Sequence, residues 1–437
     1  MRLGQVIHAD PLGRGGIQTH VRLLCEDLAA RGHEVHALAH QVTARPQPPR
    51  VVAQDGWSYE LRTRAGGTPF GEPAIEQHLA HEVVQWARSR RLQVVHVHHL
   101  SGCGALAVSA LQAAGLAVVV SVHDFEHVCP RGQMWSDEGR CVDLELARCT
   151  RCTLSTWPAV PAPADPQQAL DMRRKRALRA LAGAHALVAP SAAGLDLYRQ
   201  RMPELCQANW TVVENGIRAA RLRQQVRALR SSLAGSPAGT VRMGLVGAVQ
   251  PSKGVLPLAQ AVVALACART SGPSLELWIH GTPTAAADAR ALWQQLLQLA
   301  AQHPCVRLHG GFDAQALPRI LAQLDVLAAP ALWDEIHGLS VREGLAAELW
   351  TVATERGGLA ALPQEHAGAL QLPADEPASW ALALAQALPR WVMPPRAVPL
   401  PREAAQCARE MEALYVTVWA AARRHTSSTA AAATFQA

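Results

Sequence analysis

Short apolar runs alternate with longer segments of helical periodicity along nearly the whole chain, and this alternation restricts the fold more than any other feature. The apolar runs have the length and β-branched content of buried strands. In the first half they are RLGQVIH (2–8), EVHALAH (34–40), QVVHVHH (93–99), AVVVSVH (117–123), ALVAP (186–190) and TVVEN (211–215). Helical segments separate them, as strands and crossover helices do in a doubly wound parallel sheet.

A second series of the same kind follows a stretch rich in Ser, Gly and Pro. Its predicted strands are 242–248, 275–281, 306–310, 325–330 and 351–355. We therefore predict an α/β protein with two Rossmann-like domains whose sheets face a cleft, and a C-terminal helix that packs back on the first domain. The predicted bounds are an N-terminal domain over 1–218, a linker over 219–240, a C-terminal domain over 241–395, a helix over 402–424 and a disordered tail over 425–437.

Composition excludes several classes of protein. The chain has 437 residues, of which 49% are hydrophobic and 17% charged, so it is globular rather than disordered. Its net charge of +6 suits phosphorylated ligands or an anionic membrane surface and is too small for a dedicated nucleic-acid binder. The N-terminus lacks the apolar core of a signal peptide, and no uncharged apolar run reaches membrane-spanning length. We expect a cytoplasmic protein, with peripheral contact at the inner face of the membrane left open.

Two glutamates follow the predicted strand 325–330, in the stretch WDEIHGLSVRE. Glu335 falls at the carboxyl end of that strand, where parallel sheets bind ligands. Glu343 falls in the first turn of a predicted helix over 341–349. The spacing allows two interpretations, because Ser340 and Glu343 also fit a capping box that would only satisfy backbone donors. Spacing alone does not decide between them.

Glycines and a lysine follow two other predicted strands. Gly13, Gly15 and Gly16 open a helix after the first strand, where they could form a tight turn or let a phosphate approach the helix amides. Lys253 lies between a strand and a helix and could neutralise a departing diphosphate. The alternative is a solvated lysine, which the positive end of the helix dipole disfavours.

These motifs, taken in order, resemble the retaining glycosyltransferases of the GT-B fold, family 4, also called group 1. The resemblance rests on GRGGIQTHV, on His123-Asp124 at a strand end, on Lys253, on the paired glutamates and on the Gly357–Gly358 loop. It implies that His123, Glu335 and Lys253 are catalytic. It further implies that the donor is bound by Gly15, Gly16, Lys253, Gly338, Leu339 and Glu343, the last through the ribose hydroxyls.

The resemblance implies retaining, metal-independent transfer of a hexose from a UDP- or GDP-linked donor to an acceptor hydroxyl. The product would be an exopolysaccharide or a lipid-linked glycan. Two departures from the family pattern favour an alternative, a non-catalytic sugar-nucleotide-binding subunit that partners an active transferase. Ala248 and Val249 stand where many relatives carry an arginine, and Ala347–Thr351 reads AELWT where relatives read alanine-glycine-x-proline-valine. A nucleotide-sugar epimerase is disfavoured by the pairing of the glutamates with Lys253.

Four cysteines form a separate group in a Cys-rich insertion over 127–155. Cys129, Cys141, Cys149 and Cys152 could hold a structural zinc ion, since four thiolates in a short loop-rich stretch suit tetrahedral coordination. Free thiols are an equal alternative, and a disulfide is the least favoured in a reducing compartment. No cofactor is expected for catalysis.

Two further patterns have structural alternatives. His96 and His98 share one face of a strand, so a metal pair is conceivable, although histidines that line a core or a cleft are commoner. The run RRKR (173–176) starts a predicted helix. It is expected to be a solvated helix face, with contact to anionic lipid as the alternative.

Overall fold

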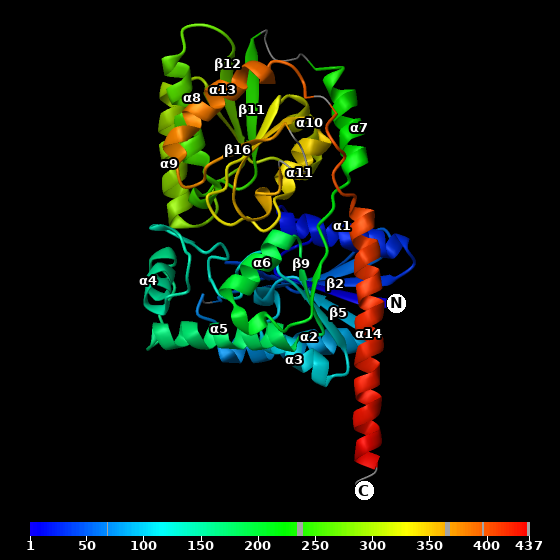
Figure 1. Ribbon diagram of the computed structural model, residues 1–437. Coiled ribbons are helices and arrows are strands. Elements are labelled where there is room, and N and C mark those ends of the chain that lie inside the picture. The colour runs from blue at the N-terminus through cyan, green and yellow to red at the C-terminus, as the bar shows by residue number, and fades with distance from the viewer. Residues whose placement is uncertain (68, 234–238, 363–367, 396, 435–437) are drawn as a thin grey trace. The chain divides into compact units, whose positions relative to one another are not determined.

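The computed structural model describes residues 1–67, 69–233, 239–362, 368–395 and 397–434, and it shows two compact units (Figure 1). The first unit comprises Met1–Gly132, Val142–Asn215 and Ala404–Ala437, and the second comprises Gln133–Cys141 and Gly216–Glu403. Each contains one mainly parallel sheet between helices. This confirms the predicted fold class. The segment Gln133–Cys141, from the middle of the Cys-rich insertion, belongs to the second unit.

The first unit is built on an eight-stranded sheet. Its strands are β1 Arg2–Ile7, β2 Glu34–Val42, β3 Arg50–Ala53, β4 Trp57–Arg64, β5 Val94–Val97, β6 Ala117–Ser121, β9 Ala186–Ala189 and β10 Trp210–Val212. The order is β10-β9-β6-β5-β1-β2-β4-β3, and only β3 is antiparallel to its neighbour. The chain leaves β1 toward β2 on one side and, after β4, returns to pair β5 with the other side of β1. The carboxyl ends of β1 and β5 therefore flank a switch point, where open α/β sheets bind ligands.

Helices cover both faces of this sheet. They are α1 Gly16–Ala30, α2 Pro73–Ser89, α3 Leu106–Ala113, α4 Leu146–Thr156, α5 Pro166–Gly183, α6 Ala192–Arg201 and α14 Ala404–Thr434, with short 3-10 turns η1 Leu100–Gly102 and η2 Pro203–Leu205. Helix α14 lies against α1 (Figure 1), and Met411 and Tyr415 join the apolar core there. The helix predicted over 402–424 thus continues through most of the predicted tail. Residues 435–437 lie outside the described part.

The second unit is built on a six-stranded parallel sheet. Its strands are β11 Thr240–Val246, β12 Ser274–His280, β13 Val306–Gly310, β14 Val326–Ala329, β15 Trp350–Thr354 and β16 Leu370–Leu372, and a separate hairpin pairs β7 Trp135–Ser136 with β8 Gly139–Arg140. The order is β13-β12-β11-β14-β15-β16. Here the chain leaves β11 toward β12 and later returns to its other side as β14. The switch point therefore lies between the carboxyl ends of β11 and β14.

Two helix layers enclose this second sheet (Figure 1). The helices are α7 Ala219–Arg230, α8 Val255–Ala268, α9 Ala287–Gln302, α10 Leu317–Ala322, α11 Leu339–Ala346 and α13 Trp380–Trp391, with 3-10 turns η3 Pro251–Lys253, η4 Ala314–Ala316, η5 Gly357–Leu359 and η6 Pro377–Ser379. One apolar cluster joins α8, α9 and α13 to the sheet, and another joins α7, α10 and α11. Helix α7 occupies the first half of the predicted linker. Across the described residues, no helix is both long and apolar enough to cross a membrane.

Candidate functional site

The loops that follow β11 and β14 are in direct contact at the switch point of the second sheet. The amide of Leu332 donates to the carbonyl of Ser252 at 2.8 Å. Gly254 has a left-handed φ of 66°, and a Cβ atom at this position would overlap the carbonyl oxygen of Pro330. A glycine is therefore required for the two loops to approach so closely. This contact fixes Lys253 beside the residues that follow β14.

Lys253 and Glu335 form an ion pair across these loops. The Lys253 ammonium donates to Glu335 Oε2 and lies 5.2 Å from the ring centroid of Trp333. The side chains remain 31% and 17% exposed, so a ligand can reach both charges. The two residues that the family resemblance marks as catalytic in this unit are therefore adjacent, at the edge where the topology predicts a ligand.

The amino end of α11 excludes the capping-box interpretation. The helix begins at Leu339 with Gly338 as its N-cap, and within the described part of the chain it has no side-chain capping hydrogen bond. Ser340 lies inside the helix. Glu343 falls in the second turn, because α11 starts two residues earlier than predicted. The first amides of α11 thus carry no side-chain cap, and they could meet an anion.

The carboxyl of Glu343 lies in a desolvated place. Although the residue keeps some exposure, burial raises its pKa from 4.5 to about 7, and no charged group opposes this shift. Such a carboxyl is costly to ionise in the folded chain unless a ligand provides hydrogen-bond donors. Ribose hydroxyls are donors of this kind.

The Gly357–Gly358 loop supports the backbone of Glu335. The Gly358 amide donates to the Glu335 carbonyl at 2.6 Å. A Cβ atom on Gly357 would overlap that carbonyl, and one on Gly358 would overlap the Ile336 carbonyl. Both glycines are therefore needed for η5 to pack against the Glu335 loop. The role of this pair is positional.

Sequence reasoning missed two residues of the hairpin segment, Gln133 and Arg140. Arg140 Nε donates to Asp334 Oδ2 at 3.0 Å, and Ser252 Oγ donates to Gln133 Oε1 at 2.7 Å. Both contacts are made to immediate neighbours of Glu335 and Lys253. No local signal in the sequence could show that this hairpin lies on these loops.

In the first unit, Gly15 and Gly16 lie at the start of α1 as predicted. Gly15 is the N-cap with a φ of 141°, no side-chain cap is found for the helix among the described residues, and its first turn contains no acidic residue. These features suit an anion at the helix amides. The donor contacts assigned to Gly15 and Gly16 stay a prediction, since the structure contains no ligand.

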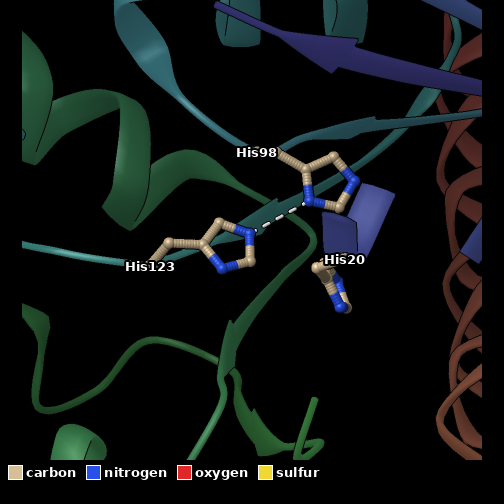
Figure 2. A group of neighbouring side chains, drawn as sticks. All are labelled: His20, His98 and His123. Carbon is tan, nitrogen blue, oxygen red and sulfur yellow. Dashed lines mark hydrogen bonds between the residues drawn. The ribbon is translucent and has the colours of Figure 1, made fainter. Parts of the chain in front are cut away.

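His123 lies just beyond β6, at the same edge of the first sheet. It is half-buried, and its Nε2 is 3.1 Å from Nδ1 of His98, which follows β5 (Figure 2). His20, on α1, is close to both rings (Figure 2). The structure favours the commoner alternative for His96, a core histidine, over a metal pair with His98. Both ring nitrogens of His96 are engaged, at 2.7 Å with Tyr415 and at 2.8 Å with Ser121.

Asp124, the neighbour of His123, belongs to an ionic network with His99 and Glu126. His99 Nε2 is 3.8 Å from Asp124 and its Nδ1 is 3.6 Å from Glu126. Burial acts to raise the pKa of Asp124, but the interaction with the His99 ring outweighs it, so the net pKa is lowered. Likewise burial acts against the charged form of His99, but Glu126 and Asp124 raise its pKa overall. The network fixes the backbone beside His123.

The four cysteines of the insertion are free thiols in the structure. Cys149 and Cys152 lie one turn apart on α4, and Cys141 belongs to the second unit whereas the other three belong to the first. Burial raises the pKa of the Cys152 thiol, and Arg131 opposes this shift. Among the described residues, no three of these cysteines lie within metal-ligating reach of one another. The structural zinc stays a prediction.

The RRKR run does not form a solvated basic face. It lies within α5, which starts at Pro166, and three of its four cations contact the first unit. Arg173 donates to the Glu126 carbonyl at 2.6 Å, Arg174 to the Val128 carbonyl at 2.9 Å, and Arg176 pairs with Glu76 at 3.0 Å. Lys175 is exposed and pairs with Asp171. The run therefore offers little charge to a membrane.

The unusual segment AELWT lies at the amino edge of the second sheet, opposite Lys253 and Glu335. Glu348 has a left-handed φ of 56°, where the family pattern has glycine, and its carboxylate accepts two bonds from Arg227, at 2.6 and 2.7 Å. Trp350 donates to the Met393 carbonyl at 2.7 Å. The departure thus alters packing at the edge away from the ligand-binding loops.

Comparisons with known proteins agree with this architecture. A sequence model of Glycosyltransferase Family 4 matches residues 14–221, and a model of Glycosyl transferases group 1 matches residues 240–389. A comparison with curated proteins found no significant match.

Several solved structures share the fold over nearly the whole chain. Sucrose-phosphate synthase from Thermosynechococcus elongatus has a TM-score of 0.64 at 17% identity, with 99% of this chain and 100% of that chain covered. Trehalose-6-phosphate protein from E. coli, bound with UDP-2-fluoro glucose, has a TM-score of 0.63 at 12% identity, with 98% of each chain covered. Anabaena HepE, in complex with UDP and glucose, has a TM-score of 0.59 at 16% identity, with 99% of each covered.

Two parallel-sheet units, each with its candidate ligand loops at a switch point, define the chain as a glycosyltransferase of the GT-B fold. The two sequence models cover its two halves in order and leave out residues 1–13, 222–239 and 390–437. The chain belongs to the group 1 glycosyltransferases of family 4.

Proposed function

We propose that this glycosyltransferase transfers a hexose from a UDP- or GDP-linked donor to an acceptor hydroxyl with retention of configuration. The observation that carries the proposal is the accessible Lys253–Glu335 ion pair at the switch point of the second sheet. The complexes of HepE with UDP and glucose and of the E. coli protein with UDP-2-fluoro glucose favour a UDP-linked donor.

Donor binding would rearrange this ion pair. A diphosphate is a stronger partner for the Lys253 ammonium than a single carboxylate, so it would draw the ammonium away and leave Glu335 to accept sugar hydroxyls. The amides at the starts of α8 and α11 have no side-chain caps and would supply further donors, including those of Gly338 and Leu339. Glu343 would accept the ribose hydroxyls. Lysine and amides together could stabilise the diphosphate without a metal ion at this unit.

In the reaction, the bond between the anomeric carbon and the phosphate oxygen breaks, and the nucleoside diphosphate leaves with the bonding electrons. The acceptor oxygen forms its new bond on the face that the leaving group vacates, and its proton passes to the departing phosphate. Glu335 would hold the sugar during this step, and His123 of the first unit would donate a hydrogen bond to it, a role that rests on the family resemblance. We place the product in exopolysaccharide or lipid-linked glycan synthesis on the same basis.

The alternative is a sugar-nucleotide-binding subunit without turnover. The observation that favours it is the pair Ala248–Val249, which provides no cation where many relatives carry an arginine. A chain of this kind would bind donor nucleotides and release no nucleoside diphosphate from them.

A donor screen separates the two functions. Purified protein is incubated with a panel of nucleotide sugars, with and without acceptor extract, and released nucleoside diphosphate is measured. We expect acceptor-dependent release from one donor. Lys253→Ala and Glu335→Gln should each lower kcat/KM by about 10²–10³-fold, while the control Lys175→Ala, on the exposed side of α5, should not. Unchanged turnover in both site variants would exclude this site, and donor binding without release would support the alternative.

A further inference from the structure

Three histidines from separate segments converge at the carboxyl edge of the first sheet. His20 comes from α1, His98 follows β5 and His123 follows β6, so the cluster spans the switch point of that sheet (Figure 2). One ring nitrogen of each lies within 4.8 Å of the corresponding nitrogens of the other two. Among the described residues, no other group of three His, Cys, Asp or Glu side chains has its ligand atoms this close together.

The hydrogen bonds around His98 leave a lone pair directed into the cluster. Its Nε2 is 2.8 Å from the carbonyl oxygen of the Gln5 side chain, which can only accept, so Nε2 carries the proton. Nδ1 therefore carries the lone pair, and it is Nδ1 that faces His123. Metal-binding histidines typically donate their second ring N–H to such an oxygen, which fixes the tautomer and the ring orientation.

His20 provides an independent indication of a ligand. Its side chain is 3% exposed, and its Nε2 is buried without a hydrogen-bond partner among the described residues. Buried polar atoms are nearly always satisfied, so an unpaired one points to a group that completes it.

We propose that His20, His98 and His123 bind a divalent transition-metal ion of the zinc type. Imidazole nitrogens suit this class of ion, and three protein ligands leave one position open for water or a substrate oxygen. At bond lengths of about 2.0–2.1 Å, tetrahedral ligand nitrogens are roughly 3.3 Å apart. The 3.1 Å separation of His98 and His123 is already close to this value, and a small side-chain movement of His20 would complete the site.

The three proposed ligands belong to the first unit, whereas Lys253, to which the diphosphate is assigned, belongs to the second. Ligation through His123 Nε2 would place the ring proton on Nδ1. If the proposed function holds, this would make His123 a fixed donor toward the sugar.

The test is titration of the chelator-treated full-length protein with Co²⁺, followed by competition with Zn²⁺. We expect one equivalent of Co²⁺ to bind. Its spectrum should show the visible absorption of a nitrogen-ligated, four-coordinate ion and should lack the near-ultraviolet charge-transfer band that cysteine ligands give. His20→Ala should weaken this binding at least tenfold, and Gln5→Ala should weaken it by about 10–100-fold through loss of the outer hydrogen bond. His78→Ala is the matched control, since its side chain is 72% exposed on α2 and outside the cluster.

Two results would overturn the proposal. One is wild-type protein that shows no saturable nitrogen-ligated Co²⁺ spectrum, a measurement that needs no variant. The other is a folded His20→Ala protein, judged by circular dichroism, that binds the ion with unchanged affinity. Nucleotide binding is measured on the same samples. A protein that binds the metal ion but no nucleotide would contradict only the proposed function, and one that binds nucleotide but no metal ion would contradict only the metal site.

Discussion

Replacing Glu343 by glutamine should stabilise the second unit above neutral pH and, at the same time, weaken nucleotide binding. The carboxyl is desolvated, and its pKa is raised from 4.5 to about 7. Below pH 4.5 the group is protonated in both the folded and the unfolded chain, so it has no effect on stability. As pH rises from 4.5 to 7, only the unfolded chain releases the proton, and the folded state loses stability. Above pH 7 the full penalty remains.

The size of this penalty follows from the two pKa values. The difference between 4.5 and about 7 corresponds to about 3 kcal/mol, and the partial exposure of the residue lowers the expected value to about 2–3 kcal/mol. A glutamine fits the same space and cannot ionise. For a unit of this size, each kcal/mol shifts the melting temperature by about 2–4 °C. The Glu343→Gln protein should therefore melt roughly 4–12 °C higher than the wild type at pH 8.5 and nearly together with it at pH 4.5.

Thermal melting of both proteins across this pH range, and isothermal titration with UDP and GDP, measure the two effects. We expect nucleotide affinity to fall about tenfold or more in the variant, because an amide accepts at only one oxygen where a carboxylate can accept both ribose hydroxyls. Glu355→Gln, on the exposed loop after β15, is the matched control. A melting difference that does not grow with pH would refute the desolvation argument. Unchanged nucleotide affinity would refute the ribose assignment.

Three other substitutions test the geometry of the second unit. Gly338→Ala places a Cβ atom 2.5 Å from Leu359 Cδ2 at a φ of 77°, and should cost about 1–3 kcal/mol and weaken nucleotide binding; an unchanged melting temperature would contradict this. Glu348→Asn should change the free energy of unfolding by less than about 1 kcal/mol, because asparagine tolerates the left-handed φ better and this gain offsets the lost ion pair with Arg227. Loss of nucleotide binding in this variant would show that the amino edge of the sheet does influence the site. Arg140→Ala should destabilise the unit by roughly 1–3 kcal/mol because Asp334, which is 3% exposed, loses its ion pair with Arg140. Adding Asp334→Asn should restore part of this stability, and a double variant as unstable as Arg140→Ala alone would show that the ion pair is not the cause.

The architecture and the location of most site residues could be predicted from the sequence. Strand and helix periodicity are local properties, and in a parallel sheet every strand ends at the same edge. Gly15, His123, Lys253 and Glu335 were therefore assigned to ligand-side loops before any contact was known. The strand order then determines where the switch point of each sheet lies and therefore which of these loops are neighbours.

The sequence left a question open, or favoured the wrong answer, where the answer depended on atoms brought together from distant parts of the chain. The capping box at Ser340 was equally compatible with the local sequence, and only the observed start of α11 excluded it. The RRKR run looked like a solvated face because its partners lie on other elements.

The sequence by itself determined two parallel-sheet units and the strand ends that carry the candidate chemistry, because these follow from short-range patterns of burial. Only the tertiary structure decided that Lys253 pairs with Glu335 across 82 residues, that Arg140 meets Asp334, and that His20 joins His98 and His123. The desolvation of Glu343 was decided at the same level. Each of these depends on strand order and loop packing, because these decide how far apart two charged or polar groups lie and how deeply they are buried. Distance and burial in turn set the strength of the electrostatic interactions and the size of the pKa shifts.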